Sequence, residues 1–282
     1  MNRSDDMRFT KMQGAGNDYI YVNCFEETVN DPENVSVKVS DRHFGIGADG
    51  LVLIMPSDRA DVRMRIFNAD GSEAKMCGNA SRCIGKYVYE RGIIRKDTIT
   101  LETNSGIKIL HIDTNDGRAE VSVDMGTAAF KPDMIPVLST EPMINAPLTS
   151  DGVTYTVTAV SMGNPHCVIF GDDPDGIPIE RIGKAIEHDP VFPDRVNVEF
   201  AQVIDSETIK MRVWERGSGE TLACGTGACA TAAAAVKNGL CPKGHGIKLL
   251  LRGGVLNITV NEEWSVVMSG DAGFICDGEI EI

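Results

Sequence analysis

The chain has 282 residues, of which 42% are hydrophobic and 24% charged, a composition typical of a folded protein with a sizeable core. The net charge is −14, and no run of Lys and Arg alternates with aromatic residues, so neither nucleic acid nor an anionic membrane is an expected partner. The N-terminus lacks the apolar segment of a signal peptide, and the aliphatic run 232–236 is too short to span a bilayer. We therefore expect a soluble cytoplasmic protein.

The first half of the chain reads as several strands and one long helix. Segments 19–23, 51–55 and 62–67 are short apolar or alternating runs, as in buried and half-buried strands. After Cys77-Gly78 the apolar residues recur at steps of three and four, which predicts a helix that Gly92 ends. Two further strands are expected at 107–112 and 119–125.

The second half repeats this order. Strands are expected at 167–170 and 209–214, and a helix follows Cys224-Gly225 until Gly239. Residues 228–236 of that helix are almost all Ala and Cys, so we expect it to be buried within its sheet. Strands thus outnumber helices, with one long central helix in each half.

An internal duplication explains the repeated order. FNADGSEAKMCGN, residues 67–79, aligns without gaps on WERGSGETLACGT, residues 214–226, an offset of 147 that also relates VRMRIF to IKMRVW and Asn17 to Asn164. MGTAAF and SGDAGF match at a slightly different offset, 269 − 125 = 144. We expect an α/β (α+β) fold of two pseudo-symmetric domains, each a mostly antiparallel sheet or barrel around a central helix. The predicted domains are 1–126 with 275–282, and 127–274.

Two of the eight cysteines stand out because the duplication pairs them. No pair is spaced C-x-x-C and no histidine lies in a zinc-like arrangement, so no metal is expected. Cys77 and Cys224 each precede a helix, where free N–H groups and the helix dipole favour a thiolate, and we expect a lowered pKa at both. The remaining six are expected to fill the core: Cys24, Cys83, Cys167, Cys229, Cys241 and Cys276.

Two equivalent thiols on opposite sides of a cleft between the domains suit the inversion of an amino-acid α-carbon. One thiolate removes the proton from one face, and one thiol delivers a proton to the other. Backbone N–H groups at Gly78-Asn79 and Gly225-Thr226 are candidates to hold the α-carboxylate as it gains enolate character. Glu215 could bind an ammonium and Arg216 a carboxylate, which favours a substrate charged at both ends.

Several motifs resemble diaminopimelate epimerase along nearly the whole chain: MQGAGNDYIYVN, DRHFGIGADG, FNADGSEAKMCGN-x-x-R, MGNPH, RVNVEF and WERGSGETLACGTGACA. The resemblance implies a lysine-biosynthesis isomerase that interconverts LL- and meso-diaminopimelate without pyridoxal phosphate. It implies Cys77 and Cys224 as the acid–base pair, with His166 and Glu215 assisting. It also implies substrate contacts from Asn17, Asn68, Asn164, Asn197 and Arg216, and a homodimer as a further expectation.

The chain departs from the family pattern at two positions. Gly50 stands where many members have Gln, which removes one side-chain contact opposite Asn197 in the repeat. Ala80 stands where CGNG is common, a change that suits a helix.

Other interpretations compete with this one. Asn17 is about equally a turn residue, a lone His166 is more often structural, and Glu73 and Glu220 are expected to serve loop or cap geometry. FGIGADG contains G-x-G-x-x-G but precedes a strand, which argues against dinucleotide binding, and no lysine forms a distinctive pyridoxal-phosphate anchor. A proline or hydroxyproline racemase is the rival enzyme, although such enzymes carry His where this chain has Asn79. A non-catalytic amino-acid-binding protein is the rival of another class.

Overall fold

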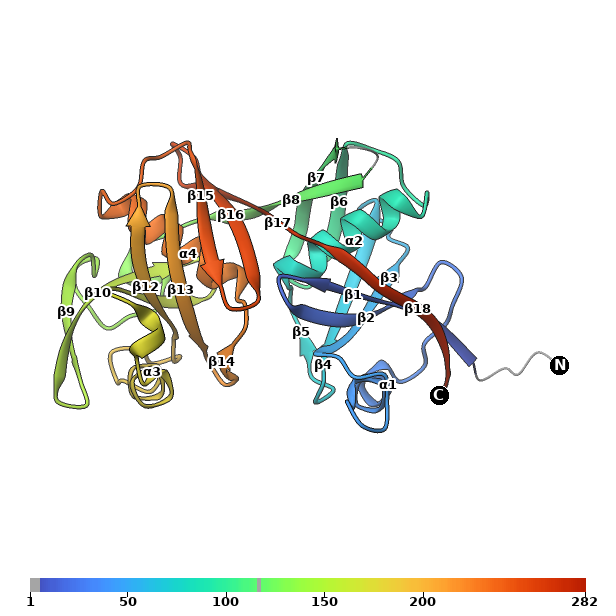
Figure 1. The fold of residues 1–282 in the computed structure, drawn as a ribbon, viewed down its shortest axis with the longest axis horizontal. Coiled ribbons are helices and arrows are strands. Elements are labelled where there is room, and N and C mark those ends of the chain that lie inside the picture. Colours follow the sequence, from blue (N-terminus) through green and yellow to red (C-terminus); the bar gives the residue numbers. More distant parts are fainter. Residues whose placement is uncertain (1–5, 116–117) are drawn as a thin grey trace. The chain divides into compact units, whose positions relative to one another are not determined.

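The computed structural model of the protein describes residues 6–115 and 118–282. The chain divides into two compact units, Met1–Val123 with Ser269–Ile282, and Asp124–Met268. It passes from unit 1 to unit 2 within strand β8, Arg118–Thr127, and returns within strand β17, Ser265–Gly270. Each unit is described on its own below (Figure 1).

Unit 1 is a mixed, mostly antiparallel sheet in the order β18-β1-β2-β3-β4-β6-β7-β8, with β5 paired to β4. Among the described strands of unit 1, only the β2–β3 and β4–β6 pairs are parallel. The last strand of the chain, β18, therefore pairs with the first. The strands not yet bounded are β1 (Asp6–Gly14), β2 (Asn17–Asn23), β3 (Gly50–Met55), β4 (Val62–Asn68), β5 (Glu73–Ala74), β6 (Thr98–Thr103), β7 (Gly106–Asn115) and β18 (Gly273–Glu281).

Unit 2 repeats this order as β9-β10-β11-β12-β13-β15-β16, with β14 paired to β13. Its parallel pairs are β11–β12 and β13–β15, the counterparts of those in unit 1. Its strands are β9 (Ala146–Ser150), β10 (Val153–Ser161), β11 (Pro165–Phe170), β12 (Asn197–Asp205), β13 (Thr208–Glu215), β14 (Gly219–Thr221), β15 (Gly246–Leu251) and β16 (Gly254–Val260). Unit 2 also contains two short 3-10 helices, η1 (Pro132–Met134) and η2 (Pro174–Gly176).

The 147-residue offset found in the sequence holds for the strand registers. Ile20 lies opposite Leu51 in unit 1, and Cys167 lies opposite Val198 in unit 2. The next strands agree as well, with Phe67 opposite Glu73 and Trp214 opposite Glu220. The predicted strands and the expected pseudo-symmetric α/β architecture are confirmed.

A central helix packs against each sheet. Helix α2, Gly78–Glu90, contacts β1 and β7, and helix α4, Gly225–Lys237, contacts β10, β11, β12, β15 and β16 (Figure 1). Gly92 and Gly239 follow these helices with positive φ, the conformation that stops a helix at least cost for glycine. Residues 227–235 of α4 are buried, as its small apolar side chains predict.

In each unit the other face of the sheet is covered by a short helix that we did not predict. This helix is α1, Pro32–Ser40, in unit 1 and α3, Ile179–Glu187, in unit 2, and the two lie 147 residues apart. Nine residues give only two and a half turns, too short for a clear periodic signal. Helices on both faces explain why β2, β3, β11 and β12 are buried on both sides, as parallel pairs normally are.

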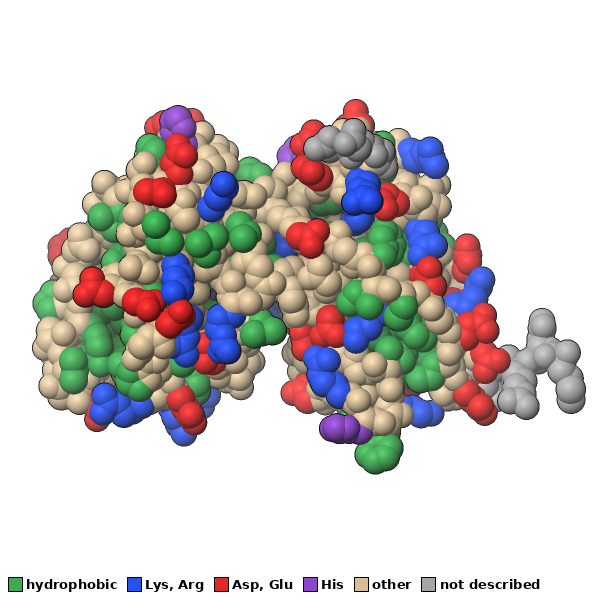
Figure 2. Space-filling view, in the orientation of Figure 1, with side chains coloured by type: hydrophobic (Ala, Val, Ile, Leu, Met, Phe, Trp, Pro, Cys, Tyr) green, Lys and Arg blue, Asp and Glu red, His purple; other side chains and the backbone are tan. Residues whose placement is uncertain are grey.

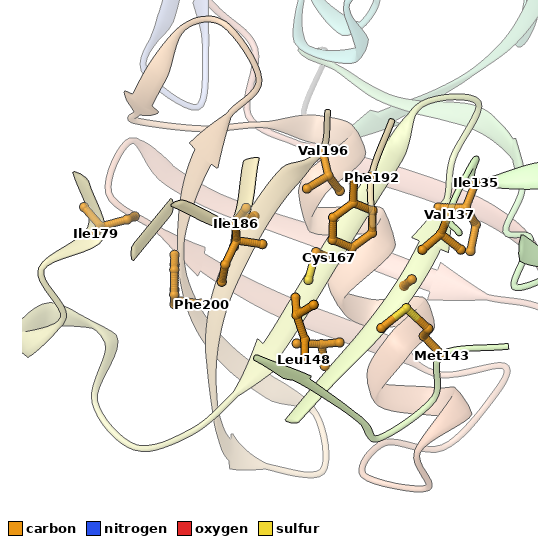
Figure 3. Packing of buried hydrophobic residues seen from close by; sticks show 13 residues of the cluster. Ile135, Val137, Met143, Leu148, Cys167, Ile179, Ile186, Phe192, Val196 and Phe200 are labelled. Carbon is orange, nitrogen blue, oxygen red and sulfur yellow. The ribbon is translucent and has the colours of Figure 1, made fainter. Parts of the chain in front are cut away.

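The core of unit 2 lies between α3 and its sheet. Figure 3 shows Ile179 and Ile186 of α3 near Phe200 of β12, with Cys167 of β11 in the same cluster. Cys167 is completely buried, as expected of a cysteine that fills the core, whereas the same expectation is wrong for Cys276, which is exposed on β18. The matching core of unit 1 combines Val39 of α1 with strand residues such as Ile20, Leu51 and Phe67.

Acidic side chains are scattered over the visible surface of each unit, with Lys and Arg among them and no basic stripe in this view (Figure 2). Among the helices of the described residues, none is long and apolar enough to cross a membrane.

Candidate active site

Each reactive-cysteine candidate is the N-cap residue of a central helix. Cys77 caps α2 and its sulfur accepts a hydrogen bond from Ala80 N at 3.5 Å. Cys224 caps α4 in the same extended conformation, and its sulfur accepts from Gly227 N at 3.4 Å. The first N–H groups of a helix have no partner within the helix, so both thiols lie at a point that attracts negative charge.

In unit 1, Asn17 lies next to Cys77. The Cys77 Sγ is 3.5 Å from Asn17 Oδ1, and Asn17 Nδ2 donates to Asp49 Oδ2 at 2.7 Å. Asn17 is the first residue of β2, and the turn before it is formed by Ala15 and Gly16 at positive φ, so the turn role considered for Asn17 is wrong. Asp49, which the sequence gave no reason to single out, fixes the orientation of this amide.

A buried arginine stabilises the first turn of α2 in unit 1. Gly78 and Asn79 are the first two residues of α2 and both are buried. Arg82, fully buried, donates from Nη2 to Asn79 Oδ1 at 3.1 Å. Asn68 ends β4 and donates to Ser72 Oγ at 3.0 Å, so its amide supports the adjacent hairpin.

In unit 2, a connected set of polar side chains leads from the protein interior to Cys224. His166 is fully buried, with Nδ1 2.7 Å from Glu199 Oε1 and Nε2 3.0 Å from Asn164 Oδ1. Asn164 Nδ2 donates to Thr226 Oγ1 at 3.3 Å, and that hydroxyl lies 3.5 Å from the Cys224 Sγ. The structure thus brings together four of the predicted site residues and adds Glu199.

Glu199 was missed because it stands in an apolar strand without any motif of its own. It lies on β12 between Val198 and Phe200 and is completely buried. An acidic residue inside a doubly covered strand is the only signal that the sequence offered.

The predicted residues Glu215, Asn197 and Arg216 lie where β12 and β13 meet the β13–β14 turn. Glu215 Oε1 accepts from Thr221 Oγ1 at 2.5 Å. The Asn197 side chain donates to Pro165 O at 2.9 Å and accepts from Arg216 N at 2.9 Å, so it is engaged by the chain itself. The exposed Arg216 guanidinium donates to Asp194 O at 2.8 Å. The side-chain hydrogen bonds of Asn68 and Arg216 go to Ser72 and Asp194, close to each residue's own loop.

The expected lowering of the Cys224 pKa is wrong for this structure. Burial is the largest effect and raises the pKa of the Cys224 thiol well above its ordinary value, and negative charge on Glu215, or on Glu199 whenever that carboxyl is ionised, raises it further. The hydrogen bonds from Thr226 and Gly227 act in the opposite direction but do not outweigh burial. Burial thus favours the neutral thiol at Cys224.

Glu73 and Glu220 fix loop geometry and cap no helix among the described residues. Each forms a two-point ion pair with an arginine of the neighbouring strand: Arg65 with Glu73 at 2.8 and 3.0 Å, and Arg212 with Glu220 at 2.8 and 3.1 Å. These paired contacts hold the hairpins that precede the two cysteines.

Gly50 has a steric reason to be glycine. It opens β3, and a Cβ built there would collide with the carbonyl of Phe67 and the ring of Tyr19. A side chain at this position would require the backbone to move. Among the described residues, no three His, Cys, Asp or Glu side chains form a group that could hold a metal ion.

Comparison with solved structures defines the class of fold. A phenazine biosynthesis protein of the PhzF family from Bacillus anthracis matches with a TM-score of 0.72 at 16% identity, covering 98% of this chain and 99% of that one. A hydroxyproline epimerase from Agrobacterium vitis matches with a TM-score of 0.69 at 14% identity, covering 99% and 94%. The chain thus has the two-domain α/β fold that these proteins share.

Sequence comparison identifies the family within this class. The model of the diaminopimelate epimerase family matches residues 9–131 and 158–275. The diaminopimelate epimerase of Acetivibrio thermocellus is 57% identical over 279 residues, covering 98% of this chain and 99% of that protein. The diaminopimelate epimerase of Desulfovibrio desulfuricans is 53% identical over 285 residues, covering 98% and 99%. The chain belongs to the diaminopimelate epimerase family, as its motifs predicted.

Proposed function

We propose that this protein is a diaminopimelate epimerase of lysine biosynthesis that works through the thiols of Cys77 and Cys224. It interconverts the LL and meso isomers by inverting one α-carbon. The observation that carries the proposal is the duplicated N-cap: each central helix begins at a cysteine, at the same position of two equivalent folds. The 57% identical relative supports the choice of substrate.

The two thiols exchange roles in one turnover. The thiolate of one cysteine takes the α-proton, so a C–H bond breaks and an S–H bond forms. The thiol of the other cysteine gives its proton to the opposite face of the same carbon and becomes the thiolate. The reaction requires both groups within reach of one carbon, and exchange of the thiol protons with solvent restores the starting state.

Stabilising the carbanion is the harder task, because the α-proton of an amino acid is a very weak acid. As the proton leaves, negative charge moves onto the α-carboxylate. The N–H groups of Gly78 and Asn79 in α2, and of Gly225 and Thr226 in α4, are fixed dipoles that can receive that charge. They need no reorganisation during the reaction, which is where their catalytic advantage comes from.

The remaining predicted residues are proposed to bind the charged groups of the substrate. Glu215 and Arg216 offer opposite charges next to each other at the end of β13. Asn197 holds the backbone of Arg216 and therefore positions it. Asn17, Asn68 and Asn164 supply neutral donors and acceptors to the ammonium and carboxylate groups. The expected homodimer stays a prediction.

The test is turnover of a substrate panel by purified, reduced protein without added cofactor. LL- and meso-diaminopimelate should be interconverted, whereas proline and hydroxyproline should not. Epimerisation of proline alone would favour the rival racemase, which the Asn79 side chain argues against. Turnover of no amino acid, together with equal alkylation of both cysteines with and without diaminopimelate, would favour a structural scaffold that has no substrate site.

A further inference from the structure

The strongest unexplained feature of unit 2 is a carboxyl group that is buried beside the reactive thiol. Glu199 and His166 both have side chains with no solvent exposure. The Glu199 Oε2 atom has no hydrogen-bond partner in the described part of the chain. A buried carboxylate with one bare oxygen is costly, so this group calls for a physical explanation.

The hydrogen-bond partners of His166 indicate which of its nitrogens carries the proton. Nε2 faces Asn164 Oδ1, which can only accept, so Nε2 must donate. A neutral imidazole then has a lone pair at Nδ1, and the atom facing Nδ1 is Glu199 Oε1 at 2.7 Å. Glu199 can donate to that lone pair only if its carboxyl group is protonated.

Burial acts on Glu199 in the same direction. Desolvation raises the pKa of the Glu199 carboxyl, and the charge of Glu215 adds to this, while His166 opposes it. The titratable groups that act on Glu199 are His166 from β11 and Glu215 from β13, and those that act on Cys224 are Glu215 and Glu199. A neutral acid also makes the unpartnered Oε2 tolerable, because a carbonyl oxygen loses less on burial than an anionic one.

The hydrogen bonds form a series that leads from Glu199 to Cys224, and in each of them the donor lies on the Glu199 side. With Glu199 protonated, its hydroxyl donates to Nδ1 of His166, and Nε2 of His166 donates to Asn164 Oδ1. Nδ2 of Asn164 donates to the Thr226 Oγ1, which leaves the Thr226 hydroxyl hydrogen free for the Cys224 Sγ at 3.5 Å. Such an arrangement stabilises a thiolate at Cys224 and so opposes the effect of burial.

The helix beside the thiol is shaped to admit this carboxyl. A Cβ at Gly227 would lie 2.8 Å from Glu199 Oε1 and 3.3 Å from the Cys224 Sγ. In unit 1 the equivalent positions, 147 residues earlier, are Ala80 and Val52. The glycine and the buried acid thus occur together in one half and are both missing from the other.

We propose that Glu199 is a positioning residue, whose protonated carboxyl group sets the Nε2–H tautomer of His166 and so directs a chain of hydrogen-bond donors onto the Cys224 sulfur. Its catalytic meaning rests on the proposed function, but the arrangement itself does not. This series of hydrogen bonds stabilises the thiolate of the buried Cys224 in the direction of the reaction in which Cys224 is the base. It also gives the two pseudo-symmetric halves different means of activating their thiols.

The direct test is ¹⁵N NMR of the full chain labelled at histidine, with His166→Gln used to assign the His166 signals. We expect a neutral imidazole at neutral pH, protonated at Nε2 and unprotonated at Nδ1. Protonation of both nitrogens, which would mean an ion pair with Glu199, would overturn the proposal. The opposite tautomer, with the proton at Nδ1, would do so equally.

The second test measures alkylation of Cys224 against pH in a Cys77→Ser background, read by mass spectrometry of the Cys224 peptide. Glu199→Leu should raise the pH midpoint by about one unit, a roughly tenfold loss of rate below it. Glu199→Gln should keep the wild-type midpoint, because its amide N–H can donate to Nδ1. The exposed Glu207→Gln is the control for loss of one acidic group.

An unchanged midpoint in Glu199→Leu would overturn the proposal. A shift in Glu199→Gln as large as that in Glu199→Leu would also do so, because it would show that the carboxylate charge matters. If Glu199→Leu does not fold, the NMR experiment and Glu199→Gln still decide. Neither measurement needs turnover. Failure to epimerise diaminopimelate would therefore refute the proposed function but would leave the tautomer of His166 and the pH midpoint of Cys224 alkylation unaffected.

Discussion

Cys77 and Cys224 occupy equivalent N-cap positions but have different surroundings. Cys77 is half-buried beside the amide of Asn17, whereas Cys224 is buried beside two acidic residues. The helix start was predictable, because the CG pair, the small residues and the apolar periodicity are local features. The raised pKa of Cys224 was not, because it depends first on burial and then on the charge of Glu215, which reaches the thiol from another strand.

Replacing either thiol by a hydroxyl should abolish epimerisation in both directions. A serine hydroxyl is too weak an acid to share protons with the substrate, and each direction uses one thiol as base and the other as acid. We expect Cys77→Ser and Cys224→Ser each to lower kcat by at least about a hundredfold, measured by optical rotation or coupled assay. Cys276→Ser, an exposed position on β18, is the matched control. Full activity in either catalytic variant would rule out the two-thiol mechanism.

At the scale of elements, the duplication allows equivalent positions of α2 and α4 to be compared, because they carry different side chains. Gly227 is packed against Glu199 and Cys224, whereas its counterpart in α2 is Ala80. The sequence showed that Ala80 departs from the family pattern and that alanine suits a helix. It could not show why α4 keeps a glycine, since the reason is a contact with a strand 28 residues earlier (227 − 199).

Gly227→Ala should therefore destabilise the protein although alanine is the better helix former. The added methyl group must displace the Glu199 carboxyl or the Cys224 sulfur, which we expect to cost about 1–3 kcal/mol in the free energy of unfolding. Turnover should fall by up to about a hundredfold, because the thiol is misplaced. The reciprocal Ala80→Gly should cost only the propensity difference of about 1 kcal/mol. Urea unfolding and steady-state assays of both variants test this; a more stable Gly227→Ala would contradict the packing.

Helix α2 also buries a thiol that links stability to pH. Burial raises the pKa of Cys83 from 9.0 to about 12. Between these values an unfolded chain loses this proton and the folded protein keeps it, so stability falls as pH rises through that range. One thiol contributes a slope of about 1.4 kcal/mol per pH unit.

Cys83→Ala should remove this contribution, so its free energy of unfolding should decline less steeply than wild type between pH 9 and pH 12. Cys24 and Cys241, whose pKa values are raised to about 11, remain to give both proteins some slope. Urea unfolding across this pH range measures the difference. Parallel curves would show that Cys83 ionises in the folded protein as it does in the unfolded chain.

At the scale of the whole molecule, the sequence predicted two homologous halves from one ungapped offset. The structure shows that this offset governs strand register, both central helices and both short outer helices. The short helices, the Arg65–Glu73 and Arg212–Glu220 pairs, and the buried acid escaped prediction. The short helices have too few turns for a clear periodic signal, and the two ion pairs depend on the register of their hairpins. The buried acid depends on contacts with segments that are distant in sequence, whereas the cysteines and glycines carried local signals.

The most direct measurement of the two-thiol account is turnover of LL-diaminopimelate in deuterium oxide at low conversion. One group removes the α-proton and another, already exchanged with solvent, delivers its replacement. The account predicts that each molecule of meso product carries deuterium at the inverted carbon, while recovered LL substrate keeps its protium. Meso product that retains the original protium would show that one group both removes and returns the proton, and would contradict the account.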